Sequence, residues 1–207
     1  ITAIIKRVMT EHGKIIFNGN NYSDEWMKEA QRRGLLNLSS TVDALPLLTS
    51  DKNVALFEKT HVFSQEELKS RQEIYTQNYC KVLNIEAMTM LDMATMDIIP
   101  SVIKYKGDVA RSANQSLALG VEANEEKDIV SSLAKQLSVA TECVKGLKSS
   151  LAKAHSLGEN IDGARCYHDD VLTAMSALRK VCDEMELGTA KTYWPYPSYG
   201  DLLFSVH

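Results

Sequence analysis

Residues 130–154, VSSLAKQLSVATECVKGLKSSLAKA, decide the fold of this 207-residue chain. Apolar residues recur here at alternating intervals of three and four, at Val130, Leu133, Leu137, Ala140, Val144, Leu147, Leu151 and Ala154. This spacing places the side chains on one stripe of a helix, which is the heptad pattern of helices that pack side by side. We therefore predict one long helix, ~45 Å in length, that ends at the Gly-containing turn of residues 156–160.

A second helix with the same periodicity follows and ends at Gly188. Its apolar stripe consists of Ala164, Tyr167, Val171, Ala174, Leu178, Val181 and Met185. Two heptad helices joined by a short turn fold back as an antiparallel hairpin, and each large seam residue contributes about 1.5–3 kcal/mol when it is fully buried. The heptads are compatible with seams that close within one chain or between chains.

A third long helix is predicted from Ser64, because Ser64-Gln65-Glu66-Glu67 is a capping box. Pro100 lacks a backbone donor and should kink this helix, which then resumes towards Ser116. The hairpin is expected to bury its seams against this helix, whose apolar stripe consists of Leu68, Tyr75, Tyr79, Leu83, Ala87, Met90, Ala94 and Ile98. We interpret Met88, Met90, Met93 and Met96 as adaptable core filling, and a Met-rich partner groove is the alternative.

The first sixty residues contain shorter elements. Ser23 is expected to cap a helix that carries Asp24 and Glu25 at its positive end and finishes at Gly34. The other expected elements are a helix over 1–11, a brief strand or extended segment over 15–17, a turn over 18–21, a loop with Pro46 over 35–48, and a short helix over 52–59. The fold class is therefore mainly α: an elongated antiparallel bundle of long helices, preceded by short helices and loops and followed by an irregular aromatic and proline-rich C-terminal tail.

Charge and composition exclude several classes of partner. The net charge of -4 gives no reason to expect nucleic acid or an anionic membrane. No apolar run reaches the ~18 residues of a membrane span, and no signal-peptide layout occurs, so we predict a cytoplasmic protein. The chain starts as if inside an amphipathic helix, so we expect a fragment of a larger protein. Without Cys-x-x-Cys spacing, the cysteines are predicted to be reduced packing residues, namely Cys80, Cys143, Cys166 and Cys182.

The C-terminal tail differs in composition from the rest of the chain. Residues 193–204 hold five aromatic residues and two prolines within twelve positions. Such a segment is not expected to be helical and is too apolar to stay in water, so it should dock onto another surface. That surface is the bundle, a missing domain or a neighbouring subunit. A regulatory hypothesis is that the tail acts as a reversible latch between subunits. The candidate docking residues are Tyr193, Trp194, Tyr196, Tyr199, Leu202, Leu203 and Phe204.

Motifs that carry chemistry are weak or missing. A di-iron site needs paired Glu-x-x-His motifs on facing long helices, and the only such spacing, Glu58 to His61, ends a short helix. The consecutive residues His168, Asp169 and Asp170 point in different directions on a helix and are read as solvated charge. Neither a Gly-x-Ser-x-Gly nucleophile nor a glycine-rich phosphate loop occurs, and residues 18–20 are read as a plain turn. We therefore predict no catalytic, cofactor-binding or metal-binding residue in this chain.

Several segments together carry a resemblance to a known family. They are KIIFNGNNYSDEW (14–26), RGLLNL (33–38), DALP (43–46), FEKTHVFS (57–64), IEAMTM (85–90) and YWPYP (193–197). In combination they resemble the C-terminal region of type III glutamine synthetases. The resemblance covers nearly the whole chain, and its aromatic-containing segments are more specific than any heptad.

The resemblance implies a parent enzyme that makes glutamine from glutamate, ammonia and ATP with Mg or Mn ions. Its active site would lie between neighbours of a ring-like homo-oligomer, on strands whose motifs are missing here, so this chain alone is expected to be inactive. Its partners would be the rest of the catalytic domain and neighbouring subunits. Residues 1–63 would be the tail end of the catalytic domain, 64–188 the bundle specific to the type III family, and 189–207 a docking tail. The alternative is an independent helical interaction or regulatory module without enzymatic activity.

Overall fold

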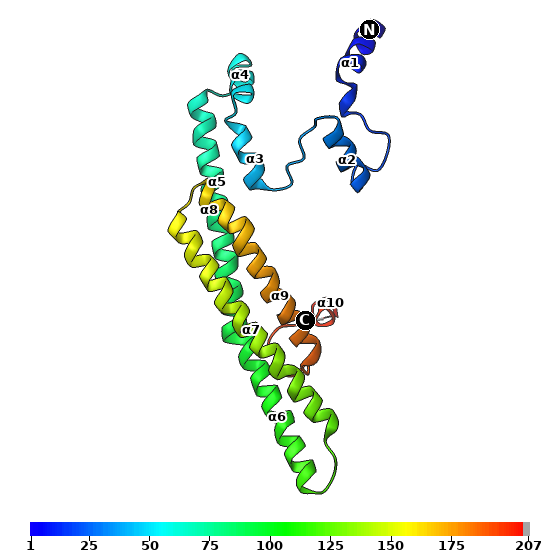
Figure 1. Ribbon diagram of the computed structural model, residues 1–207, viewed down its shortest axis with the longest axis vertical. Helices are drawn as coiled ribbons and strands as arrows, with labels where there is room; N and C mark the ends of the chain where they lie inside the picture. The colour runs from blue at the N-terminus through cyan, green and yellow to red at the C-terminus, as the bar shows by residue number, and fades with distance from the viewer. Residues whose placement is uncertain (205–207) are drawn as a thin grey trace.

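The structure, a computed structural model, describes residues 1–204, and all regular secondary structure in this range is helical. The predicted mainly α fold is confirmed. Three long helical rods pack along one another and form an elongated bundle, which Figure 1 shows along its length. None of the helices in this range combines the length and hydrophobicity that a membrane crossing requires.

Helix α7 (Asn124–Leu157) runs through the middle of the bundle and follows the heptad prediction closely. Its inward residues are all buried except Val130, which is half-buried; the buried ones are Leu133, Leu137, Ala140, Val144, Leu147, Leu151 and Ala154. Gly158 follows with a φ of 80°, a conformation that glycine adopts without strain. The chain reverses at this residue.

The returning rod consists of α8 (Ile161–Cys166), a π-helical segment η3 (Tyr167–Val171) and α9 (Leu172–Gly188). It packs antiparallel along α7, as predicted (Figure 1). One position of the predicted stripe is wrong, because Ala174 is half-buried and Met175 is buried instead. The later positions of the predicted stripe, Leu178, Val181 and Met185, are buried.

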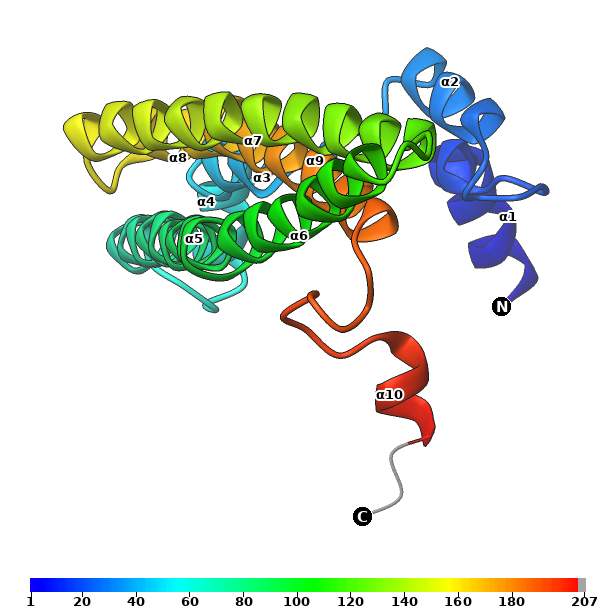
Figure 2. The same cartoon turned by 90° about the horizontal axis from the view of Figure 1, so that it is seen from below.

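The first rod consists of α5 (Gln65–Asp92), a π-helical segment η2 (Met93–Ile98) and α6 (Ile99–Ala118). The capping box is present: the Ser64 hydroxyl oxygen accepts from Glu67 N at 3.2 Å, and the Glu67 carboxylate accepts from Ser64 N at 2.8 Å. Figure 2 shows the change of direction between α5 and α6. The kink predicted from Pro100 is therefore present, with the π-helical segment directly before it.

The predicted apolar stripe of α5 needs correction. Tyr75 is 48 % exposed, and Tyr79 and Met90 are only half-buried. The inward residues are Leu68, Thr76, Cys80, Leu83, Ala87, Leu91, Ala94 and Ile98. The packed face is turned towards Thr76 and Cys80, because α3 and α8 also cover this rod. The core-filling interpretation of the methionines is wrong for Met88, Met93 and Met96, which are exposed.

The segment 35–48 was expected to be a loop, but it contains helix α3 (Thr41–Leu48). The Ser40 side chain accepts from Asp43 N at 3.1 Å and caps the helix, while Val42 is buried among the bundle residues. Gln72 of α5 donates to the Leu45 carbonyl at 3.0 Å. These contacts stabilise a helix that tolerates Pro46 at the cost of one backbone hydrogen bond. Helix α4 (Asp51–Lys59) follows as predicted.

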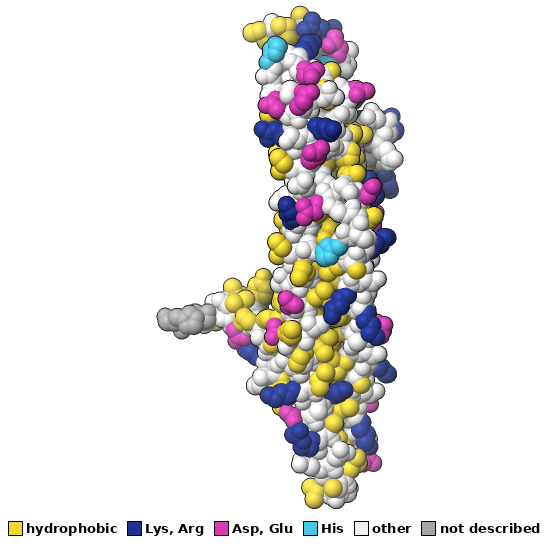
Figure 3. Space-filling model, turned by 90° about the vertical axis from the view of Figure 1, so that its left-hand side faces the viewer, with side chains coloured by type: hydrophobic (Ala, Val, Ile, Leu, Met, Phe, Trp, Pro, Cys, Tyr) yellow, Lys and Arg dark blue, Asp and Glu magenta, His cyan; other side chains and the backbone are white. Residues whose placement is uncertain are grey.

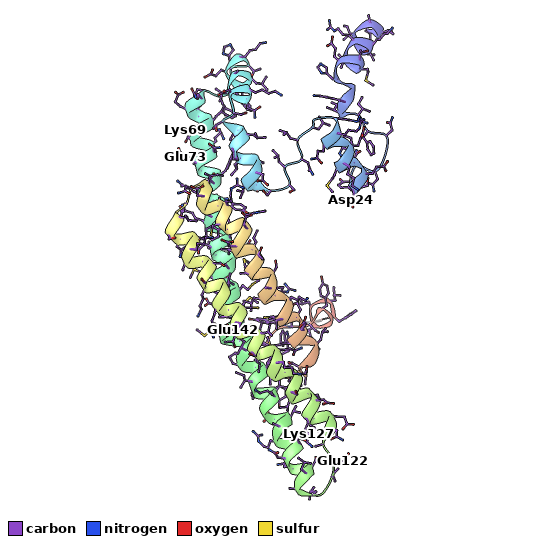
Figure 4. All side chains as sticks on the ribbon, viewed as in Figure 1. Asp24, Lys69, Glu73, Glu122, Lys127 and Glu142 are labelled. Atoms are coloured by element: carbon purple, nitrogen blue, oxygen red, sulfur yellow. The ribbon has the colours of Figure 1, made fainter. Side chains whose placement is uncertain are left out.

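The N-terminal elements α1 (Thr2–His12), the 3₁₀ turn η1 (Gly13–Ile15) and α2 (Asp24–Arg32) stand apart from the bundle, as Figures 1 and 2 show. The predicted helices are confirmed, and Ser23 caps α2 by accepting from Trp26 N. The strand alternative for residues 15–17 is wrong: Ile15 ends η1, whereas Ile16, whose backbone is extended, and Phe17 lie outside regular structure. Figure 4 shows charged Lys69 and Glu73 on the part of α5 beyond α7, where both are exposed.

The four cysteines are free thiols, and Cys80, Cys166 and Cys182 are buried among apolar side chains. The prediction of packing residues is confirmed for these three, whereas Cys143 is half-buried. Burial raises the pKa of the Cys182 thiol to about 11, which favours the uncharged form.

The turn between α7 and α8 allows a test of the fold. A Cβ atom at Gly163 would lie 1.8 Å from the Gly158 carbonyl oxygen, whereas one at Gly146 on α7 would meet no atom within 4 Å. We expect Gly163→Ala to destabilise the chain by about 1–3 kcal/mol or more, because the hairpin backbone must move. Gly146→Ala should stabilise it by about 0.5–1 kcal/mol. Thermal unfolding followed by circular dichroism measures both, and equal melting temperatures for the two variants would contradict this turn geometry.

Candidate functional site: the aromatic strap

After α9 the chain turns back across the bundle through residues 189–197, which we call the strap. Thr189 has an extended backbone, is buried, and donates its hydroxyl proton to the Met185 carbonyl at 2.7 Å. Two local hydrogen bonds then turn the chain, from Tyr193 N to Ala190 O at 2.8 Å and from Trp194 N to Lys191 O at 3.2 Å. The strap is therefore an ordered segment that begins from a fixed helix end.

Tyr193 fixes the strap to α6. Its hydroxyl donates to Asp108 Oδ2 at 2.7 Å, and its ring lies 5.1 Å from the ring of Tyr105 in a tilted arrangement. The Lys104 ammonium lies 5.8 Å from the ring centroid, within the range of a cation–π contact. Asp108 also accepts from Arg111 at 2.7 Å.

Tyr196 makes the second attachment. Its hydroxyl donates to Asp97 Oδ2 in η2 at 2.8 Å. The Trp194 and Tyr196 rings are half-buried and pack against the hydrophobic core of the bundle. Trp194 and Tyr196 thus pack against the core, while the hydroxyls of Tyr193 and Tyr196 donate to carboxylates at its edge.

These contacts change the acid–base properties of the groups involved. The hydrogen bond from Tyr193 and the positive charges of Arg111 and Lys104 lower the pKa of Asp108. Burial, together with the Asp97 carboxylate, raises the pKa of Tyr196 to about 12. Both shifts favour the protonation states that the two hydrogen bonds require, a carboxylate as acceptor and a neutral phenol as donor.

The prediction of a wholly irregular tail is wrong for Tyr199–Phe204, which form the short helix α10 after the last proline, Pro197. Ser198 donates through its N–H and hydroxyl to Asp201 Oδ2 at 2.8 and 2.7 Å, and Lys191 donates to Asp201 Oδ1. These bonds lower the pKa of Asp201 to about 2, Lys191 being the largest cause. Figure 2 shows α10 projecting away from the bundle. Its large side chains are 65–82 % exposed, namely Tyr199, Leu202, Leu203 and Phe204.

The structure therefore divides the candidate docking residues into two groups. Tyr193, Trp194 and Tyr196 contact the bundle of their own chain, whereas the α10 residues contact little of it. The remainder of the candidate tail, residues 205–207, lies outside the described residues.

The weak metal motifs do not come together. His61, at a φ of 53°, ends the α4 region in an exposed turn with Glu58. His168 lies 2.7 Å from Asp169, while Asp170 pairs instead with Lys153 at 2.7 Å. Among residues 1–204, no group of three or more His, Cys, Asp or Glu side chains could hold a metal ion.

A second cluster lies in the N-terminal unit and was not predicted. The rings of Phe17 and Trp26 stack at 4.7 Å, and Arg33 lies over Trp26 at 5.7 Å. Arg33 also donates to Glu29 at 2.6 Å and to the Ile16 carbonyl at 2.7 Å. Hydrogen bonds from Arg32 and Arg33 lower the pKa of Glu29 to about 2. The sequence offered one signal for this cluster: Trp26 and Arg33 are seven residues apart, or two helical turns, which places them on the same side of a helix.

Removal of both strap hydroxyls tests the attachments. In the double variant Tyr193→Phe, Tyr196→Phe, we expect faster amide hydrogen exchange in residues 189–197 and unchanged exchange in α7 and α9, because only the two carboxylate bonds are lost. Tyr199→Phe, at an 82 % exposed position, is the matched control. Unchanged exchange in the strap of the double variant would contradict the role assigned to these bonds.

A pH titration tests the environment of Tyr196. The pKa of a free tyrosine is about 10, and that of Tyr196 in the docked strap is about 12. The docked state therefore keeps its proton where the detached state loses it, so docking is at full strength below pH ~10 and weakens up to ~12. The difference in absorbance at 295 nm between the native chain and Tyr196→Phe should titrate near pH 12. A midpoint near pH 10 would show that the ring is solvated.

Comparison with known proteins places the chain in a family. Residues 1–116 match the family model described as glutamine synthetase C-terminal domain. The chain is 34 % identical over 208 residues to a glutamine synthetase of Butyrivibrio fibrisolvens and 30 % identical over 207 residues to a type-3 glutamine synthetase of Dictyostelium discoideum. It is 27 % identical over 213 residues to a glutamine synthetase of Bacteroides fragilis.

These alignments cover 100 %, 97 % and 99 % of this chain, in the same order, but 30 %, 28 % and 29 % of the relatives. The chain thus spans less than a third of the length of these curated relatives. The matched family range ends within α6 and includes the N-terminal unit, α3 to α5 and the kink at Pro100. Because this range is more than half of the chain, the protein belongs to the glutamine synthetase C-terminal domain family.

Proposed function

We propose that this chain is the C-terminal part of a type III glutamine synthetase and serves there as a structural and assembly element. The observation that carries the proposal is the coverage: the relatives match almost the whole chain, which accounts for less than a third of their length. The parent enzyme would make glutamine from glutamate, ammonia and ATP. An independent helical module that shares only composition does not explain an alignment of this length.

The residues of this chain do not fit the ATP and Mg or Mn ions of the proposed reaction. No cluster of possible metal ligands occurs in the described range, and the sequence lacks a glycine-rich phosphate loop. Carboxylates such as Glu29 and Asp108 are instead engaged by arginines three or four residues away. We therefore assign ATP and the metal ions to the remainder of the parent and derive no catalytic step from this chain.

Exposed apolar surface supports a role in contacts with other parts of the parent. Helix α1 has no buried residue, and its large apolar side chains are 44–60 % exposed at Ile4, Ile5, Val8 and Met9. A surface helix of a globular protein normally buries such a face. We accordingly assign residues 1–63 to the tail end of the catalytic domain, 64–188 to the bundle and 189–207 to a docking tail.

The proposed partners are the rest of the catalytic domain and neighbouring subunits of a ring-like homo-oligomer. Nucleic acid and membranes are not among them, since the net charge is -4. The cytoplasmic location stays a prediction from the sequence.

Two preparations test the proposed function. The 207-residue chain, incubated with glutamate, ammonia, ATP and Mg²⁺, should form no glutamine, whereas the full-length parent should. Deletion of residues 193–207 from the parent should change the assembly mass measured by light scattering, because the exposed side chains of α10 would no longer contact their receiving surface. Its control is the parent with the hydroxyl-only change Tyr199→Phe, which should keep the native mass.

Each arm has an outcome that contradicts the proposal. Glutamine formation by the isolated chain would place an active site within it. An unchanged assembly with unchanged activity after the deletion would remove the tail from assembly and end the idea of a latch between subunits.

A further inference from the structure

A pocket lies where α5 meets the reversal between α7 and α8. One wall comes from α5, another from the last turn of α7 and the reversal, and a third from Tyr167 at the start of η3. Its volume is about 510 Å³, within the range of sites that bind small molecules, ~300–1,000 Å³. Cys80 and Ala154, both 1 % exposed, form its inner part, and Ile85, 64 % exposed, forms its edge. Figure 3 shows a similar mixture on one side of the bundle, where hydrophobic side chains form a band between charged ones.

Two opposite charges meet at this pocket from different walls. Lys81 Nζ of α5 lies 3.4 Å from Glu159 Oε2 of the reversal, and the two side chains are 56 % and 49 % exposed. Neither charge has a second ion-pair partner among residues 1–204. An exposed ion pair of this kind adds little to stability. Lys81 and Glu159 can therefore exchange each other for the charges of a ligand at small cost.

A hydrogen bond joins two of the walls beside this ion pair. His155 Nε2 of α7 donates to Asn84 Oδ1 of α5 at 2.7 Å, since an amide oxygen can only accept. Both residues line the pocket. The bond holds the polar edge of the pocket in place before a ligand arrives, and a pre-formed site loses less freedom on binding.

Tyr167 brings to the pocket a hydroxyl that no group of residues 1–204 binds. The residue is 4 % exposed and lines the pocket. Burial, followed by the nearby Cys80 and Glu159, raises the pKa of Tyr167, and no hydrogen bond contributes to this shift. The hydroxyl thus lies beside two other pocket residues and keeps its proton. Because most polar groups of buried residues have a hydrogen-bond partner, this donor points to a ligand that supplies an acceptor.

These groups select one class of ligand. A simple anion would pair with Lys81 but be repelled by Glu159, and a simple cation would meet the reverse. An α-amino acid carries an ammonium and a carboxylate group on one carbon atom, so it satisfies both charges. Its side chain would pass Ala154 towards the Tyr167 hydroxyl, which needs an acceptor. A second carboxylate there would be repelled by Glu159, whereas the oxygen of an uncharged carboxamide would not.

We propose that this pocket binds a free α-amino acid with a carboxamide side chain. Lys81 binds its carboxylate, Glu159 binds its ammonium group, and the Tyr167 hydroxyl donates to the side-chain oxygen. The site goes beyond the structural role proposed above, because it gives the bundle a ligand of its own.

Isothermal titration calorimetry of the 207-residue chain with L-glutamine tests the charge contacts. We expect saturable binding, with a dissociation constant about tenfold or more higher for Lys81→Met and for Glu159→Gln, because each variant loses one charged contact. N-Acetyl-L-glutamine, which lacks the ammonium charge, should bind more weakly by a similar factor. Lys69→Met and Glu73→Gln are the matched controls, since both residues are exposed on α5 beyond the end of α7 (Figure 4). Their dissociation constants should equal that of the native chain.

Tyr167→Phe tests the side-chain contact. Because the hydroxyl has no partner within residues 1–204, this variant should keep the native melting temperature. It should lose the preference for L-glutamine over L-leucine, which has a similar size and no acceptor in its side chain. Retention of that preference would overturn the assignment of a carboxamide ligand. Absence of saturable binding, or equal dissociation constants for the native chain, Lys81→Met and Glu159→Gln, would overturn the site itself.

These outcomes are separable from the proposed function. Binding is measured without ATP and without ammonia, so its failure leaves the structural and assembly role untouched. If the isolated chain makes glutamine, the structural role is wrong, whereas the comparison of the Lys81 and Lys69 variants still decides whether this pocket binds the amino acid.

Discussion

Burial of the α7 seam is the interaction on which the rest of the structure depends. Leu133 and Leu147 are fully buried, and the seam packs against α6 on one side and α9 on the other. Neither neighbour could bury its own apolar stripe without α7, because helices of this kind gain most of their stability from packing and little from propensity. The strap in turn docks only where α9 ends beside α6 and η2. The order of dependence thus runs from the seam to the bundle and from the bundle to the tail.

The parts predicted well from sequence are those set by local signals. A heptad stripe such as that of α7, a capping box such as Ser64 and Glu67, and a turn glycine such as Gly158 each act within a few residues. The sequence-based predictions were wrong where contacts with segments distant in sequence determine the structure. Helix α3 forms despite Pro46 because α5 supplies contacts, and Met88 and Met96 are exposed because no other described helix packs outside α5. A methionine-rich pattern alone does not tell core from surface.

The candidate site shows the same division. Composition identified the tail residues, but their carboxylate partners are 85 and 99 residues away in sequence, at Asp108 and Asp97. Only the folded bundle brings these groups together. The sequence also could not separate Tyr196, which is held on the core, from Phe204, which is 80 % exposed. Family membership gives the enzyme class of the relatives. The described residues themselves show a helical bundle and a docked strap.

The central claim is that the α7 seam closes within one chain, which leaves α10 exposed for contacts with others. Electron–electron resonance between spin labels at Lys148 of α7 and Ala177 of α9, both exposed, tests it directly in a Cys143→Ala background. The buried Cys182 should label slowly, because the pKa of its thiol is raised to about 11. We predict a single short distance that persists when labelled chains are diluted with an excess of unlabelled ones. Loss of this distance on dilution would mean that the seam closes between chains and would contradict the account.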